Sequence, residues 1–146
     1  MKKYEFTGET KQVGFFGNIT LKRIRATMEF GIIKIGDLGG WIEKEENLSH
    51  KGDAWVYGNA KVWGNAKVFS ISHVLVVGPI GSRNDFTTFF RDKDSEITVK
   101  CGCFLGKIDK FLEKVCETHG DSKYAIVYRT AAEIAKQQID LSEEKQ

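Results

Sequence analysis

The chain has 146 residues, and its 22 Lys and Arg against 20 Asp and Glu leave a formal net charge of +2. This length suits one compact domain or two small ones, and so small a charge argues against nucleic-acid binding driven by bulk electrostatics. No apolar run approaches the ~18 residues of a membrane span, and residues 1–11 lack the apolar core of a signal peptide. We therefore expect a cytoplasmic protein that is neither secreted nor membrane-embedded.

Residues 1–41 are predicted to form β structure with turns. Strands are expected over Ile19–Ala26 and Ile32–Ile35, the second ended by the turn residues Gly36 and Asp37. The segment holds seven basic and four acidic residues, and its basic side chains cluster at Lys22, Arg23 and Arg25. A solvated strand face accounts for this cluster, and binding to an anionic partner is the sharper alternative.

Residues 52–69 contain three copies of one six-residue unit, which begin at Gly52, Gly58 and Gly64. In each unit an alanine and the valine two positions later share one face of an extended segment, and the Gly-Asn or Gly-Asp pair suits a turn. Three short strands and three turns predict one coil of a left-handed β-helix. Leu48 and Ile42 continue the inward position at six-residue spacing, so one to two coils are expected.

Three aromatic residues, Tyr57, Trp63 and Phe69, follow the valines of the repeat and are predicted to point outward together. An exposed apolar patch usually marks an interface, so we predict a seam between subunits of a homo-oligomer. Packing beneath a flanking segment and a platform for stacking a ligand are the alternatives.

After the repeat the pattern changes to a small α/β domain. A short strand over His73–Val77 precedes a hairpin of Thr87–Arg91 and Glu96–Phe104. Apolar residues at helical spacing then predict a helix ended by Gly120, and a second helix over Lys123–Ile139. The expected fold is α+β, with an N-terminal β region and coil (1–70), an α/β domain (71–140) and a flexible tail (141–146).

The motifs Gly39-Gly40-Trp41-Ile42, Val-Tyr-Gly-Asn-Ala-Lys-Val, Gly78-Pro79-Ile80-Gly81-Ser82-Arg83-Asn84-Asp85 and Cys101-Gly102-Cys103-Phe104 occur together. In this combination the chain resembles a group of phage and prophage accessory proteins with hexapeptide repeats. The resemblance implies a left-handed β-helix and a mobile-element origin, and it implies no reaction. By analogy with other accessory proteins of this size, it suggests a role against a host defence system.

The loop that contains Ser82, Arg83 and Asn84 is the first candidate binding site. Its glycines expose backbone N–H groups, and Arg83 adds a guanidinium, which together suit a phosphate or a carboxylate. The loop lacks the lysine and the spacing of a P-loop, so a tight structural turn is the alternative.

Cys101, Cys103, Cys116 and His119 provide the ligand types of a Cys₃His zinc site. Cys116 occupies a position on the apolar stripe of its helix, so burial in the core is favoured for it over metal binding. We accordingly expect no metal and no other cofactor.

No nucleophile motif is present in the sequence, so we expect a protein that is not an enzyme. A hexapeptide acyltransferase with His50 or His73 as its catalytic residue is the enzymatic alternative. The favoured function is a phage-encoded, non-enzymatic inhibitor that binds a protein effector of an antiphage system, such as a CRISPR complex. A sponge for a phosphate-bearing nucleotide signal and a structural phage assembly protein are the alternatives.

Overall fold

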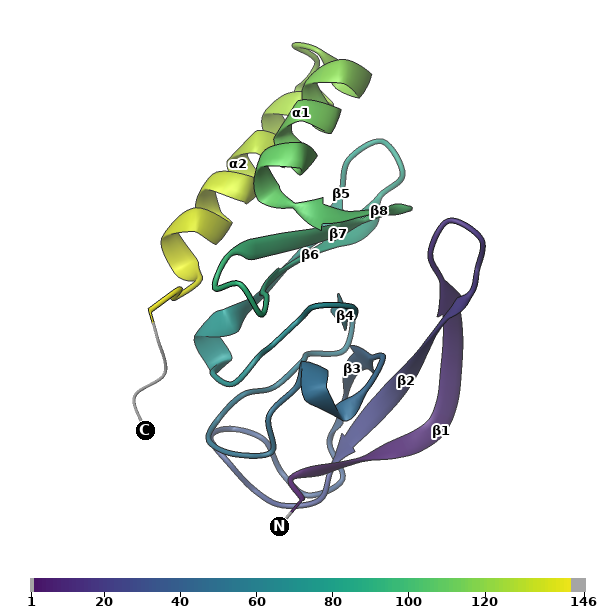
Figure 1. The fold of residues 1–146 in the computed structure, drawn as a ribbon, viewed down its shortest axis with the longest axis vertical. Coiled ribbons are helices and arrows are strands. Elements are labelled where there is room, and N and C mark those ends of the chain that lie inside the picture. Colours follow the sequence, from purple (N-terminus) through teal and green to yellow (C-terminus); the bar gives the residue numbers. More distant parts are fainter. Residues whose placement is uncertain (1, 143–146) are drawn as a thin grey trace.

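A long β-hairpin begins the chain in the computed structural model, which describes residues 2–142 (Figure 1). Its strands β1 (Tyr4–Val13) and β2 (Ile19–Ala26) pair antiparallel, and β2 pairs antiparallel with β3 (Leu38–Ile42). The bounds of β2 confirm the strand predicted over these residues.

The strand predicted over Ile32–Ile35 is wrong. A single bridge joins Phe30 and Ile33, and glycines 31 and 36 on either side have positive φ. Both glycines turn the backbone, so the segment is too short to pair as a strand. Ile32 and Ile35 consequently lie exposed, at 79% and 66%.

The repeat runs parallel to the segment that precedes it. Strand β4 (Lys61–Val62) pairs with β3, and a parallel bridge joins Leu48 to Val68 after the 3-10 helix η1 (Glu45–Asn47). The pairs Ile42 with Val62 and Leu48 with Val68 each join residues 20 positions apart. Inward burial of the repeat's alanines and valines is confirmed, since these residues are at most 4% exposed: Ala54, Val56, Ala60, Val62, Ala66 and Val68. The left-handed β-helix itself stays a prediction.

A second sheet forms after the 3-10 helix η2 (Ile71–His73). Its strands pair antiparallel in chain order: β5 (Val74–Ile80), β6 (Asp85–Arg91), β7 (Ile97–Cys101) and β8 (Phe104–Lys107). The helices α1 (Ile108–His119) and α2 (Lys123–Gln138) lie together on one face of this sheet (Figure 1). The predicted hairpin forms, but its second strand ends at Cys101 and not at Phe104, because the chain turns there and Phe104 begins β8. Both helices are confirmed, and Gly120 ends α1 with φ +57°.

Each face of the second sheet has its own core. Phe89 and Val99 pack against Phe111 and Val115 of α1, whereas Phe90 joins the core formed by the repeat. The two halves of the molecule therefore share buried surface, and the domain boundary predicted at residue 70 stays a prediction. Residues 143–146 of the predicted tail lie outside the described residues.

The overall architecture is α+β, with two sheets and two helices among residues 2–142. Neither α1 nor α2 has the length and apolar character that crossing a membrane requires.

Candidate ligand-binding pocket

A pocket of about 280 Å³ lies in the C-terminal half, where the β5–β6 loop, the β7–β8 turn and the two helices meet. Ile80, Phe104 and Val115 provide apolar walls. Polar side chains from two loops, two strands and two helices reach the same space: Ser82, Arg83, Asp85, Thr87, Cys101, Cys103, Lys114, Thr118, His119 and Tyr128. A concave, partly apolar site with a few convergent polar groups is typical of small-molecule binding.

The β5–β6 loop brings Arg83 to this pocket through a tight turn. Asn84 N donates to Gly81 O at 3.2 Å, and Gly81 and Asn84 both have positive φ. Any Cβ at Gly81 would overlap the Tyr128 hydroxyl. Glycine is therefore required at position 81 both for the turn and for contact between the loop and α2.

Tyr128 and Cys101 form the inner part of the pocket. Burial, together with the neighbouring Cys101, raises the pKa of Tyr128 to about 12. The phenol therefore keeps its proton at neutral pH and is available as a hydrogen-bond donor. Thr87 Oγ1 donates to Cys101 Sγ at 3.5 Å, and the His119 ring stacks on Tyr128 with 5.6 Å between centroids.

The charge that lines the pocket is predominantly positive. The lining contains two basic side chains, Arg83 and Lys114, and one carboxylate, that of Asp85. Within residues 2–142, neither basic side chain forms a hydrogen bond or an ion pair with another residue. Their charges are thus available to a ligand, and Arg83 offers the planar fork that suits a phosphate or a carboxylate.

The predicted loop residues divide into two groups. Ser82 and Arg83 line the pocket, whereas Asn84 is exposed in the turn and lies outside the lining. Lys114, Thr118 and Tyr128 also line the pocket, which they reach only because α1 and α2 pack over the sheet. Tyr128 fits the apolar stripe of its helix by spacing, and its hydroxyl is the one sequence signal of another role.

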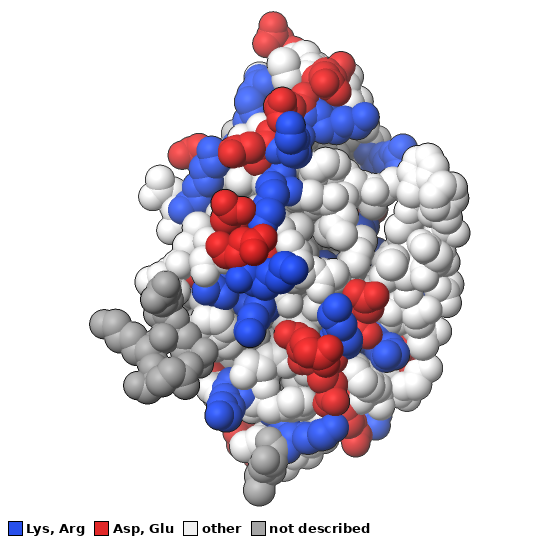
Figure 2. Space-filling view, viewed as in Figure 1, with Lys and Arg blue, Asp and Glu red and all other residues white. Residues whose placement is uncertain are grey.

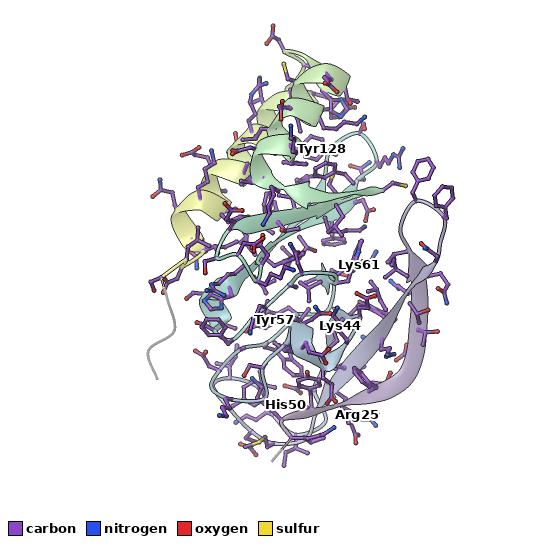
Figure 3. All side chains as sticks on the ribbon, in the orientation of Figure 1. Arg25, Lys44, His50, Tyr57, Lys61 and Tyr128 are labelled. Carbon is purple, nitrogen blue, oxygen red and sulfur yellow. The ribbon has the colours of Figure 1, made fainter. Side chains whose placement is uncertain are left out.

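The basic cluster of β2 is neutralised by its own hairpin. Arg25 pairs with Glu5 at 2.7 Å and Arg23 with Glu9 at 3.3 Å, both across from β1. Lys22 Nζ donates to the Glu43 carbonyl at 3.2 Å. In Figure 3, Arg25 lies at the hairpin, far from Tyr128 of the pocket, so the two predicted binding surfaces are separate.

The three aromatics predicted to form one outward patch lie in three different environments. Trp63 is only 5% exposed and packs with Leu21 and Trp41. The Phe69 ring is half-buried and lies 4.6 Å from the Arg91 guanidinium, whereas Tyr57 is 40% exposed (Figure 3). The prediction that the three rings are exposed side by side is therefore wrong, because the hairpin covers Trp63. A role for Tyr57 in contact between subunits stays a prediction.

The four zinc-ligand candidates do not meet as a group. Cys101, Cys103 and His119 line the pocket, but Cys116 lies outside it. Cys116 is also exposed, so its predicted burial in the core is wrong. The helix turns residue 116 away from the sheet, although its spacing fits the apolar stripe.

One group of possible metal ligands occurs among residues 2–142, formed by Asp92, Asp94 and Glu96. The ammonium of Lys107 already lies 2.8, 2.9 and 3.0 Å from their respective oxygens. Thr98 Oγ1 also donates to Asp92 at 2.6 Å. A lysine thus occupies the position that a cation would take, and the cluster stabilises the β6–β7 turn.

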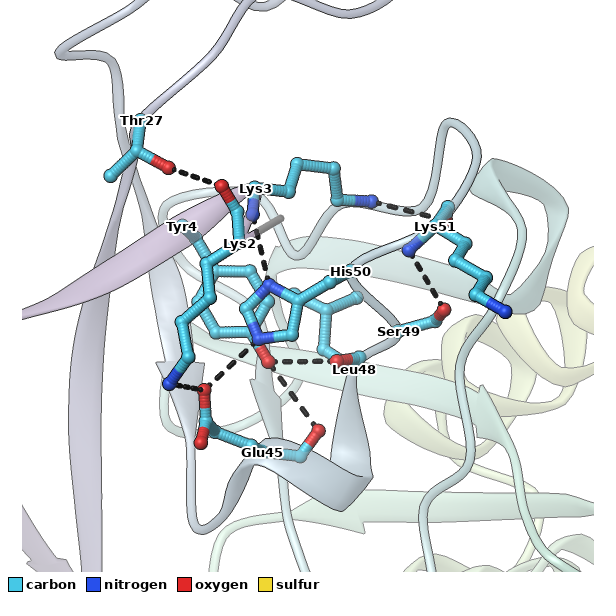
Figure 4. A network of polar contacts seen from close by, with 9 residues as sticks. All are labelled: Lys2, Lys3, Tyr4, Thr27, Glu45, Leu48, Ser49, His50 and Lys51. Atoms are coloured by element: carbon cyan, nitrogen blue, oxygen red, sulfur yellow. Dashed lines mark hydrogen bonds and ion pairs between the residues drawn. The ribbon is translucent and has the colours of Figure 1, made fainter.

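The two histidines proposed for an acyltransferase reaction are held in structural contacts. His50 Nδ1 accepts from Lys3 N and its Nε2 lies 3.0 Å from Glu45 Oε1, while its ring stacks on Tyr4 at 4.0 Å (Figure 4). His73 is 2% exposed, and its Nδ1 accepts from Phe69 N. His50 lines a second hollow of about 380 Å³ together with Glu45 and Lys51, whereas His73 lines neither this hollow nor the pocket at Arg83.

No protein-family profile matches the chain. A segment of 62 residues is 32% identical to the uncharacterized acetyltransferase YdcK of Escherichia coli (strain K12). This match covers 39% of the chain but only 19% of YdcK. It contradicts our expectation of a protein that is not an enzyme, because the similar protein is named an acetyltransferase.

Proposed function

We propose that this protein binds a small molecule with a phosphate or carboxylate group in the pocket of its C-terminal half. The observation that carries the proposal is the Arg83 guanidinium, placed at the pocket by a glycine-dependent turn and without an ionic partner among residues 2–142. Lys114 adds a second positive charge, and Tyr128 and Thr87 provide hydroxyl groups. Ligand pockets typically measure about 300–1,000 Å³, so a pocket of about 280 Å³ suits a sugar phosphate or one end of a larger ligand.

A phosphate-bearing nucleotide signal of an antiphage system is one ligand of this class. The pocket supports this function better than binding of a protein effector through Lys22, Arg23 and Arg25, because glutamates of β1 already pair with both arginines. Phage origin, action in the bacterial cytoplasm and self-association remain parts of the proposal. Tyr57 offers the exposed ring for contact between subunits.

The binding proposal is tested by calorimetric titration with nucleoside monophosphates, cyclic nucleotides and dicarboxylates. A ligand that binds the folded state raises the melting temperature by an amount that grows with the logarithm of its concentration relative to Kd. A hydrogen bond to a charged group contributes about 1.5–3 kcal/mol, so Arg83→Met is expected to weaken binding by about tenfold or more.

Arg129→Met is the matched control, since Arg129 is an exposed arginine of α2 outside the pocket lining. It is expected to bind like the wild type. If none of the probes binds, or if Arg83→Met binds its ligand as tightly as Arg129→Met, the pocket is not the site.

Acetyl transfer in the same pocket is the second candidate function, favoured by the similarity to YdcK. A phosphate-bearing acetyl thioester would place its anionic end at Arg83. His119 would accept the proton of an attacking amine or hydroxyl as the new bond to the acetyl carbon forms. The carbon–sulfur bond then breaks, and the departing thiolate takes up the proton.

An assay with radiolabelled acetyl thioester separates the two functions. Label that appears in an acceptor in excess over the protein, and that is lost in His119→Ala, supports transfer. Binding of one ligand per chain without label transfer supports binding alone. Loss of transfer in His50→Ala but not in His119→Ala would instead assign the reaction to the hollow that His50 lines.

A further inference from the structure

Most of the Lys100 side chain in β7 is buried, since the residue is only 5% exposed. Its ammonium forms no hydrogen bond or ion pair with another side chain or carbonyl of residues 2–142. An unpaired charge inside a protein is costly, so such a side chain normally has a counterion. Arg91 Nε is the one buried side-chain nitrogen or oxygen without a hydrogen-bond partner among the described residues, so the Lys100 ammonium reaches solvent, where an anion can approach it.

The side chain of Lys100 faces the N-terminal half of the molecule. Its neighbours Val99 and Cys101 belong to the core beneath the helices, so the alternation of a strand directs Lys100 to the opposite face. On that face the cross-strand neighbour of Lys100 is Thr88 of β6. The Thr88 Oγ1 accepts a hydrogen bond from Lys61 N at 3.1 Å. Lys61 and Lys100 therefore approach each other where the two sheets meet.

The first sheet adds further basic groups at this junction. Arg23, Trp41 and Lys61 lie side by side on β2, β3 and β4. Lys11 extends from β1 over Trp41, with its Nζ 4.5 Å from the ring centroid. Figure 2 shows a recess between the hairpin and the body of the molecule with basic atoms inside it, and Figure 3 places Lys61 between the two sheets.

Lys61 lowers the pKa of each of the other two lysines. Burial lowers the pKa of Lys100, and the charge of Lys61 lowers it further. Burial also lowers the pKa of Lys11, with Lys61 and Arg23 adding to the effect. Repulsion among these groups supports their proximity, which the strand register establishes independently.

Few acidic groups oppose these charges. Glu9 is paired with Arg23 at 3.3 Å. Asp85 acts on both Lys11 and Lys100, yet it forms no ion pair within 4.0 Å in the described chain. Three lysines against one carboxylate leave an excess of two positive charges, which matches the charge of a phosphate group.

We propose that Lys11, Lys61 and Lys100 form an oxyanion site that binds a phosphate group between the hairpin and the second sheet. Each ammonium provides up to three donors to the phosphate oxygens. The three lysines do not line the pocket at Arg83, although Asp85 lines it and also acts on Lys11 and Lys100. The phosphate site does not rest on the function proposed above. The phosphate is either the free ion or part of a small phosphate monoester.

The test is titration of inorganic phosphate and of glycerol phosphate into the full chain at constant ionic strength, followed by calorimetry. Binding by the wild type should weaken at least tenfold in Lys100→Met and in Lys61→Met. Lys93→Met is the matched control, because Lys93 is exposed and lies outside the recess. It should bind phosphate like the wild type.

Tight binding of glycerol phosphate as well as the free ion indicates a monoester ligand, and binding of the free ion alone indicates inorganic phosphate. Binding that survives Lys100→Met and Lys61→Met but disappears in Arg83→Met assigns phosphate to the pocket and overturns the proposal. Absence of phosphate binding by the folded wild type overturns it as well. Lys61→Met keeps the test decisive if Lys100→Met does not fold.

Discussion

Replacement of Gly40 by alanine tests how closely β3 lies on the repeat. Gly40 N donates to Val56 O at 2.7 Å, and the next residue, Trp41, donates to Ala60 O at 3.1 Å. A Cβ at position 40 would lie 2.5 Å from Ala60 O and 2.8 Å from Val56 Cγ1, and would overlap Tyr57 O. Two of these three atoms belong to the backbone, so rotation of a side chain cannot relieve the contact.

The cost follows from these contacts. Overpacking of a core typically costs about 1–3 kcal/mol. Relief of the contact by separating the two segments weakens two backbone hydrogen bonds, each with a net value of about 1 kcal/mol. We therefore expect Gly40→Ala to lower the free energy of unfolding by about 3–5 kcal/mol. The φ of Gly40 is not in the left-handed region, so the loss is steric and not conformational.

Urea unfolding, followed by tryptophan fluorescence, measures this loss. Gly58→Ala is the matched control: position 58 has open space for a Cβ and its φ also lies outside the left-handed region. Because alanine restricts the unfolded chain, Gly58→Ala should be neutral or stabilising by about 0.4–1 kcal/mol. If both variants unfold at the same urea concentration, the close parallel packing of β3 on the repeat is refuted.

Three further predictions concern other parts of the molecule. Burial alone would raise the pKa of Asp92, but hydrogen bonds from Lys107, Thr98 and the backbone outweigh it and lower the pKa below its ordinary value of 3.8. As the pH falls, the Asp92 carboxylate is therefore protonated in the unfolded chain before it is protonated in the folded protein, which destabilises the folded state. In urea unfolding, the free energy of unfolding of the wild type should exceed that of Asp92→Asn by less at pH 3 than at pH 5. Trp63→Ala should lower the free energy of unfolding by about 3–5 kcal/mol, whereas Tyr57→Ala should cost under about 1 kcal/mol; a large loss at Tyr57 and none at Trp63 would contradict their burial. Burial lowers the pKa of Lys3 to about 8, so the unfolded state binds more protons above that pH, and the stability of wild type relative to Lys3→Met should rise between pH 8 and about 10. An unchanged difference over that range would show that the Lys3 ammonium titrates normally.

Local patterns anticipated most of the second sheet and both helices. The hairpin around Asp92, the helix that ends at Gly120 and the helix that follows it depend on residues close together in the chain. The alanines and valines of the repeat were correctly placed inside, because a six-residue period assigns them to one face. The strand predicted at Ile32–Ile35 failed because the glycines on either side both turn the backbone.

The candidate site was anticipated only in part. Ser82 and Arg83 were identifiable, since a glycine loop with an arginine has a local signature. Tyr128, Lys114 and His119 come from helices that pack over the loop, and no spacing along the chain relates them to Arg83. Cys116 had the right period for the core but lies on the exposed side of α1.

The amino-acid sequence alone determined both helices, strand β2 and the inward face of the repeat's alanines and valines, because these depend on periodicity and on the conformational range of glycine. Only the tertiary structure decided which charges remain without a partner. Arg23 and Arg25 find glutamates on the neighbouring strand, whereas Arg83 and Lys100 find none among the described residues. Charge neutralisation depends on distances of a few ångströms between segments that are far apart in the chain, and only folding sets those distances.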